Sequence, residues 1–340
     1  NSYRQNSLRS RKLKNIQADI KSGNFKQVYL LYGEEAYLKQ QYKQNLVKAL
    51  NPDGDTMNFN HYEGKGIDVK QLIDLCETMP FFAERRVVLL EDTGFFKNKC
   101  EELADYMKEL PDYLYLVFAE TEVDKRNRMY KAVKACGSIA EFIRQDEKTL
   151  MRWAAGILGK AGKKITQRDM ELLLTKTGTD MGNLRMEMEK LISYTEGRDV
   201  VTAEDIEEIC TTQTTNRIFD MVRAVTEKNQ KRALELYYDL LTLKEPPMRI
   251  LFLLAKQYRQ LLLAKQFAAA GLAQTEIGSK LGVPGFVVKN ITTCARAYTI
   301  SELEQAVKDF VDAEESVKTG RLEDKLSVEL LIIKYSSKVK

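Results

Sequence analysis

The sequence predicts an α/β domain with a parallel, doubly wound sheet, followed by a chain that is helical to its end. Through residues 1–143, short apolar or alternating runs typical of strands take turns with amphipathic helical patterns. Such alternation with short connections requires crossover helices and parallel strands. After Arg144 the strand signals stop and only helical periodicity follows. The fold class is therefore α/β, then all-α.

Five segments of residues 1–143 are typical of strands because their residues are β-branched, aromatic or alternating. These predicted strands are 28–32, 57–62, 86–91, 113–119 and 139–142. Helical patterns lie between them. The predicted helices run from Gly33 to Leu50, from a cap at Asp68 through Cys76, near 97–109, and over 125–136.

The remaining chain divides into a small helical domain and a longer helical one. Thr202 with Asp205 predicts one capping box, and Ser301 with Glu304 predicts another. The helix after Pro246 is apolar enough to be covered on more than one side. The short helices are predicted at 147–161, 166–177, 180–195 and 202–209, and the predicted domains are 1–143, 144–211 and 212–340.

Composition narrows the class of protein without fixing its function. The 53 basic and 49 acidic side chains leave a net charge of +4, which permits contact with nucleic acid but does not require it. No apolar run approaches the roughly 18 residues of a membrane span. The polar, basic start of the sequence has no apolar signal region. We expect a cytoplasmic protein with no membrane partner.

The sequence contains few residues that could bind a metal ion or act as a catalytic nucleophile. The five cysteines are far apart and form no CxxC pair, which argues against a structural zinc site and favours a reducing compartment. The single histidine, His61, lies in an alternating segment and is expected on the surface of a strand. We expect no catalytic residue, no metal and no cofactor.

A parallel α/β domain followed by a small helical domain suggests an AAA+ module, which is tested at the phosphate loop after the first strand. That loop needs backbone amides and a lysine to hold phosphates. Here the turn is Gly33-Glu34-Glu35, with carboxylates where phosphates would bind. The sequence therefore predicts an AAA+ scaffold that hydrolyses no nucleotide.

Two other stretches partly resemble nucleotide-binding motifs. GILGKAGKK, at 156–164, has the wrong glycine spacing, ends in Lys164 instead of Ser or Thr, and follows a helix; we interpret it as a basic helix terminus. LLED, at 89–92, resembles the acidic end of a Walker B strand. Without a phosphate loop, Glu91 and Asp92 are expected to be solvated charges at the end of a strand.

Residues 275–291 suggest a different class of protein. They have the pattern of a helix-turn-helix, with a turn at Gly282. The start of the second helix is Gly285, Phe286, Val287 and Val288, and apolar side chains there favour packing in a bundle over reading base edges. The alternative function is a helix-turn-helix DNA-binding regulator.

The stretch MPFFAER, at 79–85, places two phenylalanines in what should be a turn before the strand 86–91. Two arrangements are open: both rings project, or Phe81 packs inward against the sheet and Phe82 alone projects. Met79 fits helix-end packing better than contact with a partner.

Together, several stretches resemble the delta subunit family of bacterial DNA polymerase III clamp loaders. The resemblance covers nearly the full chain in the family's order, including the missing phosphate loop. The stretches that carry it are VYLLYGEEAYLKQQ (28–41), TMPFFAERRVVLLED (78–92), YLVFAETEVDKRNRMYKAV (115–133), EPPMRILFLLAKQYRQLLLAK (245–265), LGVPGFVVKNI (281–291) and DAEESVKTGRLEDKLSVELLII (312–333).

The resemblance implies an AAA+-like domain, a helical lid domain and a helical collar domain. It also implies a non-catalytic subunit that binds the sliding clamp (the beta subunit) and holds its ring open during replication. The implied partners are the gamma/tau and delta-prime subunits and primed DNA, and the implied clamp contacts are Met79, Pro80, Phe81 and Phe82. The family's motif usually has leucine then phenylalanine where this chain has Phe81-Phe82.

Overall fold

A computed structural model describes residues 15–212, 214–283 and 285–337. The chain forms two compact units, Asn1–Gln145 and Asp146–Lys340, which we describe separately. The basic opening segment 1–14, on which the expectation of no signal peptide rests, lies outside the described residues.

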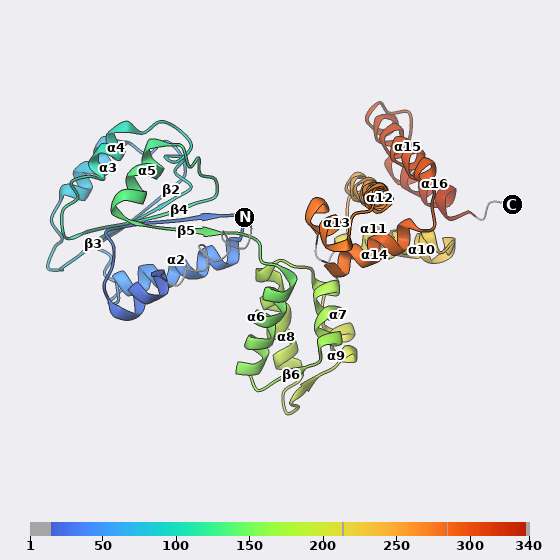
Figure 1. Cartoon of the computed structure of the whole chain (residues 1–340), viewed down its shortest axis with the longest axis horizontal. Helices are drawn as coiled ribbons and strands as arrows, with labels where there is room; N and C mark the ends of the chain where they lie inside the picture. Colours follow the sequence, from blue (N-terminus) through green and yellow to red (C-terminus); the bar gives the residue numbers. More distant parts are fainter. Residues whose placement is uncertain (1–14, 213, 284, 338–340) are drawn as a thin grey trace. The chain divides into compact units, whose positions relative to one another are not determined.

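The N-terminal unit is built on a five-stranded sheet with the order β2-β3-β4-β1-β5, in which every neighbouring pair is parallel. The predicted doubly wound sheet is confirmed, and all five predicted strands are present (Figure 1). The strands are β1 (Val28–Gly33), β2 (Phe59–Glu63), β3 (Arg86–Glu91), β4 (Leu114–Glu120) and β5 (Ser138–Phe142).

Helices cover both faces of this sheet. Successive strand residues point to opposite sides, and β1 places hydrophobic residues on both of them. Tyr29 and Leu31 pack with Leu46 of α2 in one hydrophobic cluster. Val28 and Leu30 belong to the cluster on the other face, under α3, α4 and α5 (Figure 1). The helices are α2 (Ala36–Leu50), α3 (Val69–Glu77), α4 (Glu101–Tyr106) and α5 (Arg128–Cys136).

The predicted helix near 97–109 is much shorter in the structure. Phe95 and Phe96 are buried in the core, and the amides of Lys97 and Asn98 both donate to the carbonyl of Gly94. These contacts hold the chain in turns up to the start of α4. Tertiary burial of two aromatic side chains therefore outweighs the local helical pattern.

Four helices surround a third hydrophobic cluster, made by residues between Ala154 and Cys210. All four predicted helices of this region are present, and the capping box of Thr202 with Asp205 is confirmed. A two-stranded parallel pair was not predicted, because two-residue strands show no periodicity. The elements are α6 (Glu147–Lys160), β6 (Lys164–Ile165), α7 (Gln167–Thr177), α8 (Met181–Tyr194), β7 (Val200–Val201) and α9 (Ala203–Ile209).

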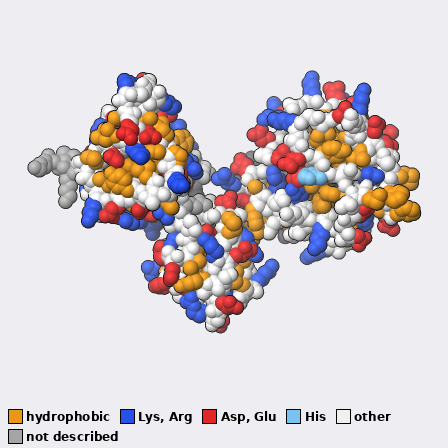
Figure 2. All heavy atoms as spheres, turned by 180° about the vertical axis from the view of Figure 1, so that it is seen from behind, with side chains coloured by type: hydrophobic (Ala, Val, Ile, Leu, Met, Phe, Trp, Pro, Cys, Tyr) orange, Lys and Arg blue, Asp and Glu red, His pale blue; other side chains and the backbone are white. Residues whose placement is uncertain are grey.

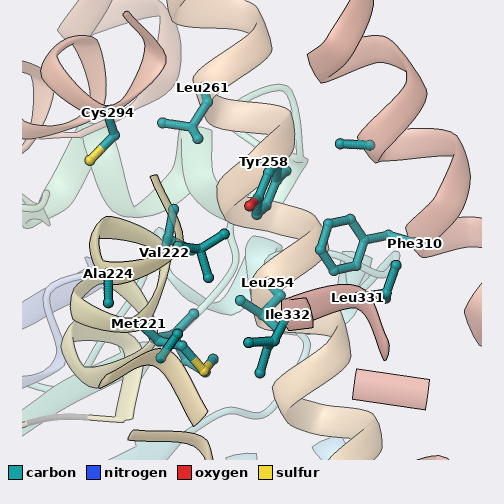
Figure 3. Packing of buried hydrophobic residues seen from close by; sticks show 14 of the residues in the cluster. Met221, Val222, Ala224, Leu254, Tyr258, Leu261, Cys294, Phe310, Leu331 and Ile332 are labelled. Carbon is teal, nitrogen blue, oxygen red and sulfur yellow. The ribbon is translucent and has the colours of Figure 1, made fainter. Parts of the chain in front are cut away.

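The last helices pack around α12, whose buried residues face more than one neighbour, as predicted. The ring centroid of Tyr258 on α12 lies 5.0 Å from that of Phe310 on α15 (Figure 3). The hydroxyl of Tyr258 is 3.1 Å from that of Tyr298. The helices are α10 (Thr214–Thr226), α11 (Gln230–Thr242), α12 (Pro247–Ala269), α13 (Gln274–Leu281), α14 (Gly285–Ala295), α15 (Ile300–Lys318) and α16 (Asp324–Ser336).

The capping box predicted at Ser301 is wrong by two residues. The structure uses Thr299, whose hydroxyl accepts from the amide of Glu302, while the Glu302 carboxylate accepts from the amide of Thr299. Both positions satisfy the Ser/Thr-x-x-Glu pattern. Burial of the preceding Tyr298 in the core fixes where the chain turns into the helix.

The hydrophobic cores of the helical unit form two separate clusters, one within 154–210 and one within 218–332. The proposed boundary between residues 211 and 212 falls in the interval between them. The division into three domains stays a prediction.

Candidate docking loop and the position of the missing phosphate loop

The predicted aromatic tip lies in the loop 78–85, between the end of α3 and the start of β3, and we call this segment the docking loop. This places it at the amino-terminal edge of the parallel sheet. Met79, Phe81 and Phe82 are 74%, 56% and 95% exposed, and Pro80 is half-buried. Both rings therefore project, and Met79 does not pack at the helix end. Figure 2 shows hydrophobic side chains projecting at the margin of the body that carries the pale-blue histidine.

The two rings meet edge to face, with centroids 4.4 Å apart and an interplanar angle of 78°. Phe82 has a φ of 50°, in the left-handed region that a bulky residue rarely adopts. Such a conformation costs of order 1–3 kcal/mol and persists only where the surroundings impose it. An exposed aromatic pair on a strained loop has the features of a surface kept for a partner.

Arg86, the first residue of β3, holds the amino end of the loop through its side chain. Its side chain is buried, with 5% exposed, although it belongs to the charged cluster ERR of the sequence. Nε donates to the carbonyl of Thr78 at 2.8 Å, and Nη2 donates to the carbonyl of Met79 at 3.2 Å. Nη1 donates to Oδ1 of Asn60 at 3.2 Å. Sequence reasoning missed this role because burial of an arginine has no local signal.

Arg85 supports the start of β3 in another way. Its guanidinium group lies 5.2 Å from the ring centroid of Phe25 and 5.4 Å from that of Tyr115, so it contacts both rings, which meet each other edge to face. Arg86 therefore ties the amino end of the docking loop to β3, and Arg85 anchors its carboxyl end, while Phe81 and Phe82 face solvent.

The opposite, carboxyl-terminal edge of the sheet is where a phosphate loop would lie. Gly33 has a φ of 127°, and a Cβ there would lie 2.1 Å from the carbonyl oxygen of Phe142. The amide of Glu35 donates to that same oxygen at 3.2 Å. The close approach of β1 to β5 thus accounts for the glycine without a phosphate.

Glu91, at the end of β3, is not the solvated charge that we expected, whereas Asp92, the next residue, is exposed as expected. Glu91 pairs with Lys43 of α2 at 2.5 Å and with His61 of β2 at 2.9 Å. Asp92 accepts hydrogen bonds from the amide and hydroxyl of Thr121. The correction has a tertiary cause, since sequence periodicity does not say which side chains neighbouring elements bring to a strand end. His61 itself is exposed on a strand, as predicted.

Lysine side chains near this edge are also engaged by the protein. Lys39 Nζ donates to the carbonyl of Glu120 at 2.9 Å, and burial lowers the pKa of Lys39. The buried carboxylate of Glu120 accepts from the hydroxyl of Thr93 at 2.5 Å, and burial raises the pKa of Glu120. The edge thus combines carboxylates with internally paired lysines, which is a poor environment for a triphosphate.

The basic stretch 156–164 begins inside α6, whose last residue is Lys160. Lys163 donates to the carbonyls of Thr195 and Arg198, both at 2.6 Å. The interpretation as a basic helix terminus is confirmed.

The helix-turn-helix pattern is also present, as α13, Gly282 with a φ of 66°, and α14. Val288 is fully buried in the bundle core and Val287 packs against that core, whereas the side chain of Phe286 lies outside the described part. The packing interpretation is confirmed.

Some kinds of site are absent from the described part of the chain. No group of three or more histidine, cysteine, aspartate and glutamate side chains there could hold a metal ion. The five cysteines, all within that part, are free thiols. None of the helices described is long and apolar enough to cross a membrane.

Comparison with known proteins decides the family. A model of the DNA polymerase III delta subunit matches residues 29–142, and a model of that subunit's C-terminal domain matches residues 215–335. The chain belongs to the DNA polymerase III delta subunit family. The two matched regions contain the docking loop and most of the last helical cluster.

Relatives of this delta-family chain agree with that assignment. DNA polymerase III subunit delta of Bacillus subtilis is 26% identical over 327 residues, which are 92% of this chain and 94% of the relative. A probable DNA polymerase III subunit delta of Aquifex aeolicus is 22% identical over 276 residues, which are 77% of each chain.

A solved structure supports the fold of the delta-family chain. The DNA clamp loader delta protein of Bacillus subtilis matches with a TM-score of 0.65 and 24% identity, over 95% of this chain and 99% of that one. The expected AAA+-like α/β domain followed by helical regions is thus the fold of this family.

Proposed function

We propose that this delta-family chain binds the sliding clamp through the loop 78–85, holds one interface of the clamp ring open for loading onto primed DNA, and hydrolyses no nucleotide itself. One observation carries the proposal. Two adjacent phenylalanines are exposed on a loop whose base is tied to the buried Arg86, in a chain of the clamp-loader delta family.

The exposed rings can supply the binding energy. Fully burying a phenylalanine side chain contributes about 1.5–3 kcal/mol. Aromatic side chains that enter a partner's pocket are a common source of binding energy at protein interfaces. Phe82, almost wholly exposed, has the most area to bury, and Phe81 and Met79 extend the apolar surface beside it. Pro80 restricts the backbone between them.

Holding a ring open requires no catalytic group. A bound protein shifts an open–closed equilibrium only by its difference in affinity for the two states. A rigid loop that fits the clamp surface of the open ring better than that of the closed ring would therefore be sufficient. The carboxylates and paired lysines at the other edge of the sheet agree with a subunit that leaves ATP hydrolysis to its neighbours.

The same proposal assigns residues 212–340 to a collar that assembles with the gamma/tau and delta-prime subunits. Leu326, Leu330 and Ile333 are exposed on α16 and recur at the spacing of one helix face. Replacing these three residues with serine should abolish co-purification with the motor subunits while leaving the α16 core contacts intact. Normal co-purification of that variant, or of a chain truncated at Thr212, would remove the collar from the proposal.

The experiment that tests clamp binding compares the wild-type chain with a Phe81→Ala, Phe82→Ala double variant, using the sliding clamp of the same organism in a quantitative binding assay. The double variant should lose at least about a hundredfold in affinity, from the two buried rings. Its thermal stability should barely change, because both rings are exposed. Phe252→Ala, which removes an exposed phenylalanine from α12, is the matched control. Undiminished binding by the double variant would refute the proposal.

A further inference from the structure

A second polar side chain, besides that of Arg86, holds the docking loop. The side-chain amide of Asn58, just before β2, grips the main chain of Phe81 at both of its polar atoms. Oδ1 accepts from the amide of Phe81 at 2.6 Å, and Nδ2 donates to the carbonyl of Phe81 at 2.8 Å. The orientation of the Asn58 amide is unambiguous, because an amide N–H can only donate and a carbonyl can only accept.

Asn58 is itself fixed by a chain of hydrogen bonds that begins at the end of α2. Asn51 holds the main chain of Asp55 in the same two-sided way: its Nδ2 donates to the Asp55 carbonyl at 2.9 Å, and its Oδ1 accepts from the Asp55 amide at 3.0 Å. The Asp55 carboxylate then accepts from Nδ2 of Asn58 at 2.5 Å and from the amide of Met57 at 2.8 Å. The hydrogen bond from Asn58 holds the pKa of Asp55 below its usual range.

Asn58 is the buried member of this series of hydrogen-bonded residues. Only 3% of it is exposed, whereas the phenylalanine whose backbone it holds is more than half exposed. Its own carbonyl accepts from the amide of Val87 in the neighbouring strand β3, at 2.9 Å. Asn58 thus belongs to the rigid sheet, and its amide transmits that rigidity to a loop that is otherwise open to solvent. A hydrophobic residue of similar size would leave the amide and carbonyl of Phe81 without these partners.

We propose that Asn58 is a positioning residue of the docking loop: the chain Asn51–Asp55–Asn58 fixes the backbone of Phe81, so that both rings are presented to the partner before binding. The proposal rests on the proposed function of the loop. The next residue, Phe82, has a left-handed φ, a strained conformation that persists only where the surroundings hold the chain. A loop held in its binding conformation loses less conformational entropy on association than a loop that must be ordered by the partner.

The test uses the full-length chain and two measurements. The first is hydrogen exchange of the Phe81 amide in the free protein, which needs no partner. Asn58→Ala removes the acceptor of that amide and should speed its exchange at least about tenfold relative to the wild type, since the amide becomes open to solvent. The matched control is Asn183→Ala, which removes an asparagine whose Nδ2 donates to the carbonyl of Thr177 in the other unit.

The second measurement is a double-mutant cycle in affinity for the sliding clamp. Asn58→Ala should weaken binding about tenfold in the wild-type chain and less in a Phe82→Ala background, because a positioning residue acts only through the rings that it presents and one of the two is then missing. Asn183→Ala should leave affinity unchanged. If Asn58→Ala does not fold, Asn51→Ala breaks the same chain two links away and should give a smaller effect in the same direction.

Equal losses of affinity in both backgrounds, or unchanged exchange of the Phe81 amide, would overturn the positioning role. If the wild-type chain does not bind the clamp, the proposed function fails on its own, and the exchange measurement still decides whether Asn58 holds the loop.

Discussion

The guanidinium group of Arg86 donates a hydrogen bond from Nε to the carbonyl oxygen of Thr78 at 2.8 Å. Thr78 directly follows α3, and Arg86 is the first residue of β3, so this bond closes the base of the docking loop. Because the arginine is buried, the carbonyl oxygens that it contacts stabilise its positive charge in place of water. The loop can therefore expose two phenylalanines without losing its attachment to the sheet.

Replacing Arg86 with methionine should destabilise the N-terminal unit by about 2–4 kcal/mol, because the Thr78 and Met79 carbonyls lose a charged hydrogen-bond donor. The adjacent Arg85 is the matched control. Its contact with the rings of Phe25 and Tyr115 is worth about 0.5–1 kcal/mol, so Arg85→Met should cost much less. Urea unfolding measures both variants. Equal losses would show that the buried contacts of Arg86 have no special weight.

Gly33→Ala should destabilise the same unit by at least about 2 kcal/mol, because the new methyl group would meet the Phe142 carbonyl oxygen and φ is positive there. Gly156→Ala is the control for the same change in a helix. Nothing lies within 4 Å of a Cβ at Gly156 inside α6, so that variant should be stabilised by about 0.5–1 kcal/mol. Thermal unfolding distinguishes the two; a neutral Gly33→Ala would contradict the close approach of β1 and β5.

The cysteine on α3 should be unreactive in the native protein. Burial raises the pKa of Cys76 to about 12, so at pH 8 the thiol is almost wholly protonated and shielded from reagents. Cys136 is exposed and should react first with a chromogenic disulfide reagent. Mass spectrometry of the peptides identifies which cysteine is modified. Rapid modification of Cys76 at pH 8 would indicate that α3 and the loop that follows it open readily.

The fold could be predicted because hydrophobic periodicity is a local signal. Residues 28–32 could be predicted as a strand because they form a continuous apolar run, and the structure buries Tyr29 and Leu31 on one face and Val28 and Leu30 on the other. The helix predicted near 97–109 was too long, because the burial of Phe95 and Phe96 is decided by the tertiary core.

The docking loop was found from sequence because two aromatic residues in a turn are unusual. Its supports were not found, since Asn58 and Phe81 are 23 residues apart and meet only when β2 lies beside β3. The same limit explains the error at Glu91, whose partners Lys43 and His61 come from a helix and a neighbouring strand. Polar contacts between distant segments depend on sheet order, which local periodicity does not contain.

The most direct test of the account is the affinity of the wild-type chain for two forms of the sliding clamp: a ring whose interfaces are covalently locked closed, and a single clamp protomer with its interface free. Binding energy that opens the ring must appear as a difference between these two affinities. The account predicts clearly tighter binding to the single protomer, with both affinities lost in the Phe81→Ala, Phe82→Ala variant. Equal affinity for the locked ring and the free protomer would contradict the claim that this chain holds the ring open.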